Sequence, residues 1–298
     1  MHVLVAGGCG YTGSVLVPQL LEIGFQVTVW DTQWFGNYLK PHHDLRVKTY
    51  DVREPGPMDG IDAIIHLANV ANDPAGDLDP KLTWEVNALA MARLADKAVR
   101  AGVGQFIYAS SGSVYGVSDA PQVTEETTLV PLTEYNKTKM VAERVLISYD
   151  ESMAVQIIRP GTVCGVSPRQ RLDITVNGMT IGALSGDRIT VVNGEQNRPN
   201  IHIEDLANLY VWMLNRPSLV GIWNAGFENL RGYEIARIVA EYVPGRAIVE
   251  SPSPDRRSYR MNSDKLLKVG FTPRHTVRDA VEELVASYAA GSIKNEDK

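Results

Sequence analysis

A tyrosine and a lysine four residues apart, Tyr135 and Lys139, are the side chains in this sequence best suited to proton transfer. Positions i and i+4 lie on the same side of a helix, so both side chains are expected to point into one space. A free tyrosine has a pKa of about 10, and a nearby lysine cation favours the phenolate and lowers that pKa. Ser111, expected at a neighbouring strand end, adds a hydroxyl that can bridge a substrate oxygen and the tyrosine. We expect these residues to take a proton from an alcohol while a hydride leaves the same carbon for a nicotinamide.

A glycine-rich turn near the N-terminus is the second feature with a clear chemical use. Residues 1–6 are expected to form a short buried strand, and residues 14–23 have helical spacing. The turn between them carries Gly7, Gly10 and Gly13. Glycines allow a tight turn and close approach to a pyrophosphate, and the N–H groups at the start of the helix face the anion. This arrangement predicts a dinucleotide site that also includes Tyr11 and Thr12.

An acidic residue after the second expected strand selects the cofactor. Asp31 follows the strand of residues 27–30 and lies 18 residues beyond Gly13. A carboxylate at this place accepts hydrogen bonds from the adenosine ribose hydroxyls and repels a 2′-phosphate. The sequence therefore predicts that the cofactor is NAD.

The elements that must position these residues alternate between strand and helix. Further strands are expected at 45–50, 61–68, 104–109, 154–159 and 221–226, and helices at 80–102, 135–149, 203–215, 232–242 and 276–291. Such alternation predicts an α/β fold with a Rossmann-type, doubly wound parallel sheet. Ligands bind at the carboxyl ends of these strands. Asp51, Leu67, Ala68 and Ser111 should therefore line one side of one crevice.

The second half of the chain alternates less regularly, which predicts a smaller, interleaved α+β substrate-binding domain. We expect residues 1–165 to form the NAD-binding domain, with residues 200–225 returning to it. Residues 166–199 and 226–298 are expected to form the substrate-binding domain, with a loop at 244–254.

Composition and charge exclude several other functions. The net charge of −6 argues against nonspecific nucleic-acid binding, which needs a basic face. The two cysteines, Cys9 and Cys164, are too few for a disulfide framework or a metal cluster. The adjacent His42 and His43 are interpreted as loop residues exposed to solvent, so no metal is expected. No apolar run approaches the roughly 20 residues that span a bilayer, and the first strand leaves no room for a signal peptide. We expect a soluble cytoplasmic protein without a membrane partner.

The motifs together resemble those of the extended short-chain dehydrogenase/reductases, over residues 1 to about 287. The matching segments are Gly7-x-x-Gly10-x-x-Gly13, Asp51-Val52, His66-Leu67-Ala68, Ser110-Ser111-Gly112-Ser113-Val114-Tyr115-Gly116 and Tyr135-x-x-x-Lys139. Residues 198–205 match a further motif of the nucleotide-sugar epimerases and dehydratases in that family. By this resemblance Tyr135 is the catalytic base, Lys139 also holds the nicotinamide ribose, and Ser111 is the third catalytic residue.

The resemblance also implies the remaining binding residues and the assembly. Asn87 matches an asparagine that shapes the cofactor site, and Arg198 matches an arginine that binds the substrate diphosphate; one of Arg256 and Arg257 is expected to do the same. The remaining residues expected to bind the cofactor are Val52 and Pro160. The remaining residues expected to bind the substrate are Ser113, Thr162 and Asn177. Family members commonly form a homodimer through a four-helix bundle, here expected from residues 81–100 and 135–149.

The residues before Val114 discriminate between reactions within the family. Dehydratases that resemble this chain typically carry Thr-Asp-Glu at the positions of Ser111, Gly112 and Ser113. Nucleotide-sugar decarboxylases usually carry a glutamate at the position of Ser113. Gly112 and Ser113 cannot act as acid or base at neutral pH, so both reactions are disfavoured. The pattern favours a 4-epimerase, in which the hydride leaves the sugar C4 and returns to the opposite face.

Two alternatives use the same sequence features. A nucleotide-sugar 4-dehydrogenase or reductase with net redox shares the hydride step, so Ser111, Tyr135 and Lys139 do not separate it from an epimerase. A non-catalytic NAD-binding sensor is disfavoured because the tyrosine and the lysine are both present. The basic run at residues 169–173 could meet a phosphate or a sugar substituent, and we favour its interpretation as a surface loop.

Overall fold

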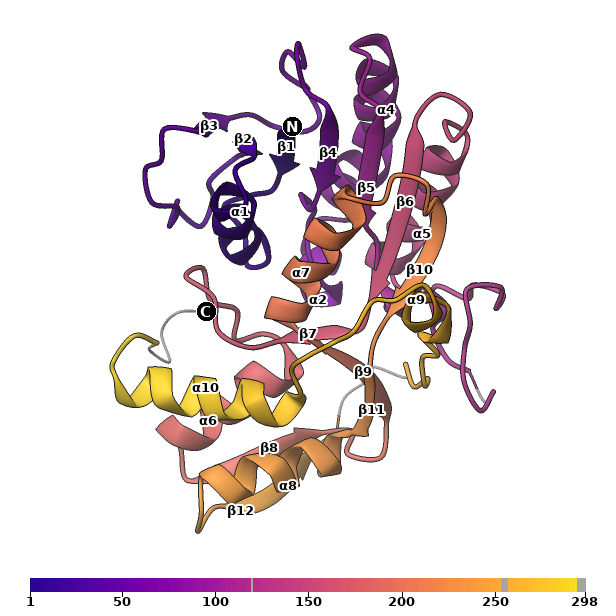
Figure 1. Ribbon diagram of the computed structural model, residues 1–298. Coiled ribbons are helices and arrows are strands. Elements are labelled where there is room, and N and C mark those ends of the chain that lie inside the picture. Colours follow the sequence, from indigo (N-terminus) through magenta and orange to yellow (C-terminus); the bar gives the residue numbers. More distant parts are fainter. Residues whose placement is uncertain (119, 253–256, 294–298) are drawn as a thin grey trace.

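The computed structural model describes residues 1–118, 120–252 and 257–293, and its centre is a parallel sheet of seven strands (Figure 1). The strand order is β10-β6-β5-β4-β1-β2-β3, and every neighbouring pair runs parallel. The strands are β1 (His2–Ala6), β2 (Gln26–Asp31), β3 (Leu45–Thr49), β4 (Ala63–His66), β5 (Gln105–Ala109), β6 (Ala154–Pro160) and β10 (Gly221–Ala225). This arrangement confirms the predicted Rossmann-type sheet.

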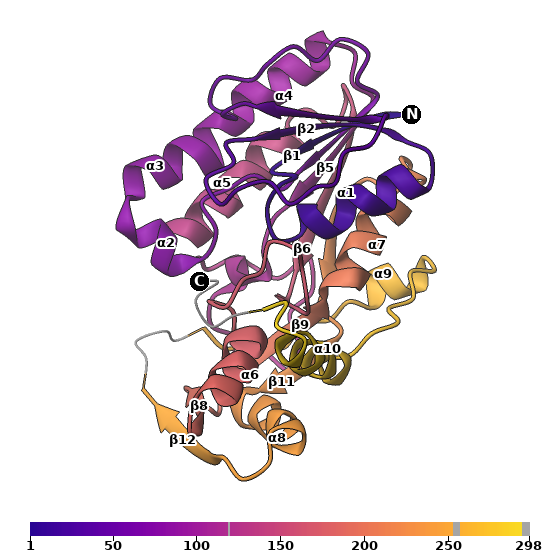
Figure 2. The ribbon, with the colours of Figure 1, turned by 90° about the vertical axis from the view of Figure 1, so that its left-hand side faces the viewer.

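Helices cover both faces of the sheet, as the near-continuous apolar strands require. One face packs against α1 (Gly13–Glu22) and α7 (Ile203–Leu214), and the other against α4 (Ala90–Arg100) and α5 (Glu134–Ile147) (Figure 2). Alternate residues of β1 serve the two cores, with Val3 and Val5 toward α1 and Leu4 toward α4.

The strand order reverses at β1, which pairs with β2 on one side and β4 on the other. The connections from these strands therefore leave in opposite directions and open a crevice at their carboxyl ends, where ligands bind in doubly wound sheets. The glycine-rich turn follows β1 at this point, and Ser110 and Ser111 follow β5.

A second group of elements lies below the carboxyl ends of the sheet (Figure 1). A three-stranded sheet has the order β11-β9-β7, and a parallel pair joins β8 to β12. Helices α6, α8 and α10 share one apolar core with β8. The elements are β7 (Thr162–Cys164), α6 (Thr175–Ser185), β8 (Arg188–Val192), β9 (Asn197–His202), β11 (Glu228–Arg231), α8 (Gly232–Tyr242), β12 (Ala247–Ser251) and α10 (Val277–Ala289).

Two segments contain elements that local spacing did not indicate. Residues 166–198, where no clean alternation with the sheet was expected, contain α6 and β8, and the expected loop at 244–254 contains β12. β8 and β12 form because each pairs with the other, across more than 50 residues of chain, and local periodicity does not reveal such a partner. The short helix α9 (Asp264–Lys268) packs back against β10 and α7 through Leu266.

The expected helix at 80–102 is divided by a π-helical turn. The chain forms α2 (Asp73–Leu78) and α3 (Pro80–Trp84), then the π-turn η1 (Glu85–Leu89), then α4. A π-turn adds a residue to the helix and often accompanies a functional site. Here it places Asn87 inside the protein, where 1% of the residue is exposed. Among the described residues, every helix is too short or too polar to cross a bilayer.

Candidate active site

One large cavity lies at the carboxyl ends of the parallel strands and has a volume of about 1630 Å³. Its walls come from the glycine turn, the loops after β2, β4 and β5, the start of α5 and the segments around β7 and β9. Most of the predicted site residues line it: Gly7, Gly10, Tyr11, Thr12, Gly13, Asp31, Asp51, Val52, Leu67, Ala68, Ser111, Ser113, Tyr135, Pro160, Thr162, Arg198 and Arg257. The structure thus brings together residues from almost the whole chain.

The glycine turn has no space for larger residues. Gly7 has a φ of +84°, and a Cβ there would lie 2.5 Å from the backbone nitrogen of Ala68. A Cβ at Gly13 would lie 2.5 Å from the carbonyl oxygen of Gly8. The turn can therefore pack tightly against the loop after β4 and against itself, and the helix N-terminus behind it favours an anion. These residues fit the pyrophosphate of a dinucleotide.

The carboxylate of Asp31 ends β2 and is held by two backbone amides. One oxygen accepts a hydrogen bond from the Cys9 N–H at 2.9 Å, and the other accepts one from the Gln33 N–H at 2.7 Å. Asp31 also lines the cavity, beside the glycine turn. The residue is thus fixed where it can accept hydrogen bonds from a ribose, as NAD requires.

A second carboxylate, Asp51, is held by an arginine two residues later. The Arg53 guanidinium donates to both Asp51 oxygens, with distances of 2.7–3.1 Å, and also reaches Glu85 of the π-turn at 2.9 Å. This contact lowers the pKa of the Asp51 carboxyl. Asp51 is therefore an ionised, oriented acceptor on the cavity wall.

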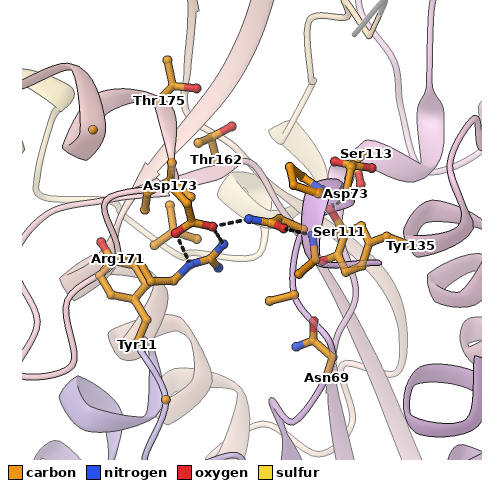
Figure 3. A pocket seen from close by; sticks show the side chains of 18 of the residues that line it. Tyr11, Asn69, Asp73, Ser111, Ser113, Tyr135, Thr162, Arg171, Asp173 and Thr175 are labelled. Atoms are coloured by element: carbon orange, nitrogen blue, oxygen red, sulfur yellow. Dashed lines mark hydrogen bonds and ion pairs between the residues drawn. The ribbon is translucent and has the colours of Figure 1, made fainter. Parts of the chain in front are cut away.

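Two of the three residues predicted to be catalytic, Ser111 and Tyr135, meet between β5 and α5. Ser111 caps the short 3₁₀ helix η2 (Gly112–Tyr115), and its hydroxyl lies 2.7 Å from that of Ser113. A hydrogen bond from Ser111 to the Tyr135 hydroxyl lowers the pKa of that phenol. Figure 3 shows Ser111, Ser113 and Tyr135 on one side of the cavity. Both Ser111 and Tyr135 are thus available to a substrate hydroxyl.

Lys139 lies beneath the cavity and does not line it. The residue is 1% exposed, and its ammonium donates to the Ala109 carbonyl at 2.7 Å. Its Nζ lies 5.7 Å from the centre of the Tyr135 ring. Burial lowers the pKa of Lys139 to about 7, against the opposing effect of the Glu143 carboxylate.

The expected lowering of the tyrosine pKa by this lysine is not found in the structure. Burial raises the pKa of Tyr135 to about 12, and the Asp73 carboxylate raises it further. The opposing contributions come from Arg171, Ser111 and Arg257, in that order. The i, i+4 spacing predicts that the lysine lies near the tyrosine. It does not reveal how strongly burial disfavours the charged forms of both residues, the Lys139 ammonium and the Tyr135 phenolate.

Asn87 and Asn177 are buried behind the cavity wall and do not line it. The Asn87 side chain accepts from the Val70 N–H at 2.8 Å and donates to the Val70 carbonyl at 3.1 Å, which fixes the loop after β4. The Asn177 amide bonds to Gly165 and donates to the Tyr11 hydroxyl at 3.1 Å. In this structure both asparagines hold cavity walls in place.

The two arginines expected at the substrate diphosphate lie side by side. The Arg198 guanidinium donates to the carbonyl oxygen of Arg257, and Arg257 pairs with Asp73 at 2.6 Å. Two cations on one cavity wall suit an anion such as a diphosphate. The other candidate for this role, Arg256, lies outside the described residues.

Sequence reasoning missed Asp73 and misread the run at 169–173. Arg169, Arg171 and Asp173 line the cavity, so the interpretation of this run as a surface loop was wrong. Arg171 pairs with Asp173 at 2.5 Å (Figure 3), and Asp173 accepts a hydrogen bond from the side chain of Asn72, in the loop after β4. The segment faces inward because Gly165 and Ser167 are bonded to Tyr11. In the local sequence, the three charged residues within five positions were the only indication that this run belongs to the site.

The two loop histidines are exposed, as expected, and their rings stack with centroids 4.2 Å apart. Together with Asp44 they offer three potential metal ligands whose atoms lie within 4.8 Å of one another. His43 is already paired with Asp44 at 2.8 Å, and His42 accepts from the Asp44 N–H. The expectation that the protein uses no metal stays a prediction.

Comparison with known proteins identifies the family. The family model described as "NAD dependent epimerase/dehydratase family" matches residues 3–226. The chain belongs to this family. It is therefore an NAD-dependent enzyme of the extended short-chain dehydrogenase/reductase type, and the predicted cofactor is confirmed.

Relatives and solved structures agree with this assignment. UDP-glucose 4-epimerase of Corynebacterium glutamicum is 27% identical, over 97% of this chain and 96% of its own length. UDP-glucuronic acid decarboxylase 1 of Xenopus tropicalis is 28% identical, over 91% and 68%. The crystal structure of Thermus thermophilus UDP-glucose 4-epimerase with NAD has a TM-score of 0.86 and 25% identity, over 98% of this chain and all of that one. The family thus includes both reactions, and the site must discriminate between them.

Proposed function

We propose that this protein is a nucleotide-sugar 4-epimerase that uses NAD. The observation that carries the proposal is that a glycine and a serine, rather than acids, follow Ser111 beside the tyrosine. A Cβ at Gly112 would lie 2.4 Å from the Met261 methyl and 3.1 Å from the Pro160 carbonyl, so a glycine fits this position best. The Ser113 hydroxyl donates to Asn136 at 2.6 Å and cannot replace a carboxylic acid. Elimination or decarboxylation would lack the usual acid at this position.

A carboxylate reaches the cavity from another segment, but both its oxygens are engaged. The Asp73 oxygens accept from Thr133 at 2.5 Å and pair with Arg257 at 2.6 Å. A carboxylate with both oxygens occupied in this way is held in place by protein contacts, which suits a structural role. This arrangement supports an epimerase over a dehydratase.

In the proposed reaction, Tyr135 takes the proton from the C4 hydroxyl and Ser111 holds the oxygen in place. Burial, with a further contribution from Asp73, raises the pKa of the Tyr135 phenol to about 12, so the substrate and the cofactor would have to favour its ionised form. Lys139, fixed to the end of β5 with its Nζ 5.7 Å from the centre of the Tyr135 ring, can add a positive charge there when it is protonated. Bound NAD would supply the acceptor for the C4 hydride and the donor for its return. The tyrosine then returns its proton to the 4-keto intermediate.

We propose that the glycine turn, Tyr11, Thr12, Asp31, Asp51 and the loop after β4 hold the cofactor, and that Arg198 and Arg257 hold the diphosphate. These sites lie in one cavity of about 1630 Å³, which is large enough for both ligands. The 4-keto sugar must rotate in the cavity between the two hydride transfers, so that its opposite face meets the cofactor. The contacts to the diphosphate therefore have to hold the nucleotide while the sugar rotates.

We extend the proposal to organisation and assembly. Residues 1–165 and 200–225 form the NAD-binding domain, and residues 166–199 and 226–298 the substrate-binding domain. The protein forms a homodimer through the helices around residues 81–100 and 135–149, where the π-turn leaves 61% of Leu89 exposed. A cytoplasmic location is compatible with the two buried thiols, Cys9 and Cys164, which form no disulfide. A monomeric mass in solution scattering would overturn the dimer.

The proposed activity is tested with purified protein and a panel of UDP-, GDP-, CDP- and dTDP-sugars. Interconversion of one C4 pair, followed by proton NMR, supports the epimerase. Accumulation of NADH absorbance and a keto sugar without an epimer would identify a nucleotide-sugar 4-dehydrogenase and refute the proposal.

A further inference from the structure

The segment of residues 165–173 crosses the cavity from a fixed starting point, the glycine turn. The Tyr11 hydroxyl donates to the Gly165 carbonyl at 2.8 Å, and the Ser167 hydroxyl donates to the Tyr11 carbonyl at 2.7 Å. Both contacts are buried, and Asn177 adds a third hydrogen bond to the Tyr11 hydroxyl. The start of this segment is therefore bound to the same turn that holds the cofactor pyrophosphate.

Farther along, the segment meets the loop that follows β2. The guanidinium carbon of Arg169 lies 4.0 Å from the centre of the Phe35 ring, a close cation–π contact. Phe35 is 61% exposed and Trp34 is 60% exposed, yet both line the cavity. Both rings therefore offer apolar surface to a ligand in the cavity.

The contact lies at the adenosine end of the cavity. Phe35 follows Asp31 by four residues, and Asp31 is the acceptor expected to meet the adenosine ribose. Burial lowers the pKa of Arg169, and Asp31 is among the acidic groups that oppose this shift. Arg169 and Asp31 are therefore close enough for their charges to interact.

We propose that Arg169 and Phe35 form a clasp over the adenosine half of bound NAD, and that opening this clasp limits how fast the cofactor dissociates. Phe35 belongs to the loop after β2 and Arg169 to the segment after β7, so their contact joins two separate parts of the cavity lining and would have to open for the adenosine to leave between them. The inference concerns cofactor release alone and holds whichever sugar reaction the enzyme performs.

The test measures cofactor release in the intact holoenzyme, without any sugar. Protein loaded with NADH is mixed with excess NAD in a stopped-flow instrument, and the loss of bound-NADH fluorescence gives the dissociation rate. Loss of the contact in Arg169→Ala or Phe35→Ala is expected to accelerate release by about tenfold. The double variant should match the single ones, because both substitutions remove the same contact.

Matched variants separate the clasp from other effects. Phe35→Tyr retains an aromatic face and should keep slow release, whereas Phe35→Leu should not. Arg100→Ala removes an exposed arginine of α4 that pairs with Asp96, and its release rate should equal that of the parent protein. Unchanged release in both alanine variants, or effects that add in the double variant, would overturn the proposal.

Discussion

The Lys139 ammonium donates to the carbonyl oxygen of Ala109 at 2.7 Å and so joins the catalytic helix to the strand that carries the two serines. Tyr135 is on α5 and Ser111 follows β5, so this contact fixes the relative position of the two groups that meet the substrate. One turn farther along α5, Glu143 accepts from the Ser110 hydroxyl at 2.5 Å. The catalytic serine and tyrosine are therefore held by a buried layer that the substrate does not touch.

Replacement of the tyrosine tests its role as the base. Tyr135→Phe keeps the ring and should reduce C4 interconversion by about 10²–10⁴-fold, the usual contribution of general acid–base catalysis. The amount of NAD bound per protein should not change. Proton NMR of the sugars gives the rate and the absorbance of the released cofactor gives the content. Tyr38→Phe, at an exposed tyrosine, is the control; an unaffected rate in Tyr135→Phe would remove the tyrosine from the mechanism.

Asp31 is predicted to discriminate between NAD and NADP. Asp31→Asn retains an acceptor for the Cys9 amide but loses the negative charge, so the preference for NAD over NADP should fall by about tenfold, or ~1.4 kcal/mol. Isothermal titration calorimetry with both cofactors measures the ratio of the two dissociation constants. Asp44→Asn, in the exposed loop after β2, should leave this ratio unchanged. An identical ratio in the parent and Asp31→Asn would contradict the assignment.

The Glu143 and Arg159 pair is predicted to dominate local stability. The two side chains are 1% and 2% exposed and form a bidentate contact with distances of 2.6 Å and 2.9 Å. Glu143→Gln removes the carboxylate charge that pairs with the buried Arg159 guanidinium, so the free energy of unfolding should fall by about 3–5 kcal/mol in denaturant titrations. Asp96→Asn, which breaks the exposed pair with Arg100, should cost less than about 1 kcal/mol. Equal effects of the two substitutions would refute this prediction.

His66 is predicted to make the protein sensitive to acid. Burial, with a contribution from the Lys139 charge, lowers the pKa of this histidine to about 3 in the folded protein. The unfolded chain, with a histidine pKa of about 6.5, binds a proton between pH 3 and 6.5 that the folded chain does not bind. The stability contribution is therefore full above about pH 6.5 and falls by about 1.4 kcal/mol for each pH unit below it.

The measurement compares unfolding free energies at pH 7.5 and pH 5. His66→Leu cannot be protonated and should lose about 2 kcal/mol less than the parent over this interval. His42→Leu, at an exposed histidine, should behave as the parent does. The same loss in His66→Leu and the parent would show that His66 does not contribute to acid sensitivity.

Features encoded locally could be predicted from the sequence. The glycine turn and Asp31 are set by short strand, turn and helix patterns, and the i, i+4 spacing of Tyr135 and Lys139 follows from helix geometry. Because parallel strands end at one edge, the meeting of Asp51, Ala68 and Ser111 in one cavity could also be predicted. These predictions depend on local strand, turn and helix patterns and on the rule that parallel strands end at one edge of the sheet.

Features that depend on distant partners could not be predicted. Asp73 belongs to the site because Arg257, 184 positions away, pairs with it. Arg169 faces inward because Tyr11 holds the start of its segment, and β12 forms only beside β8. The π-turn that buries Asn87 cannot be recognised from the spacing of apolar residues along a long helix. In each case the contact that determines the structure joins two distant segments, whereas hydrophobic periodicity describes only one segment at a time.

The most direct test of the central claim follows one hydrogen atom. The candidate sugar nucleotide is prepared with deuterium at C4, and the product is examined by NMR and mass spectrometry. Removal of the hydride and its return to the opposite face predict an epimer that keeps the deuterium at C4, with no NADH accumulating in solution. Loss of the deuterium to solvent, or a keto sugar formed together with deuterated NADH, would contradict epimerisation at C4.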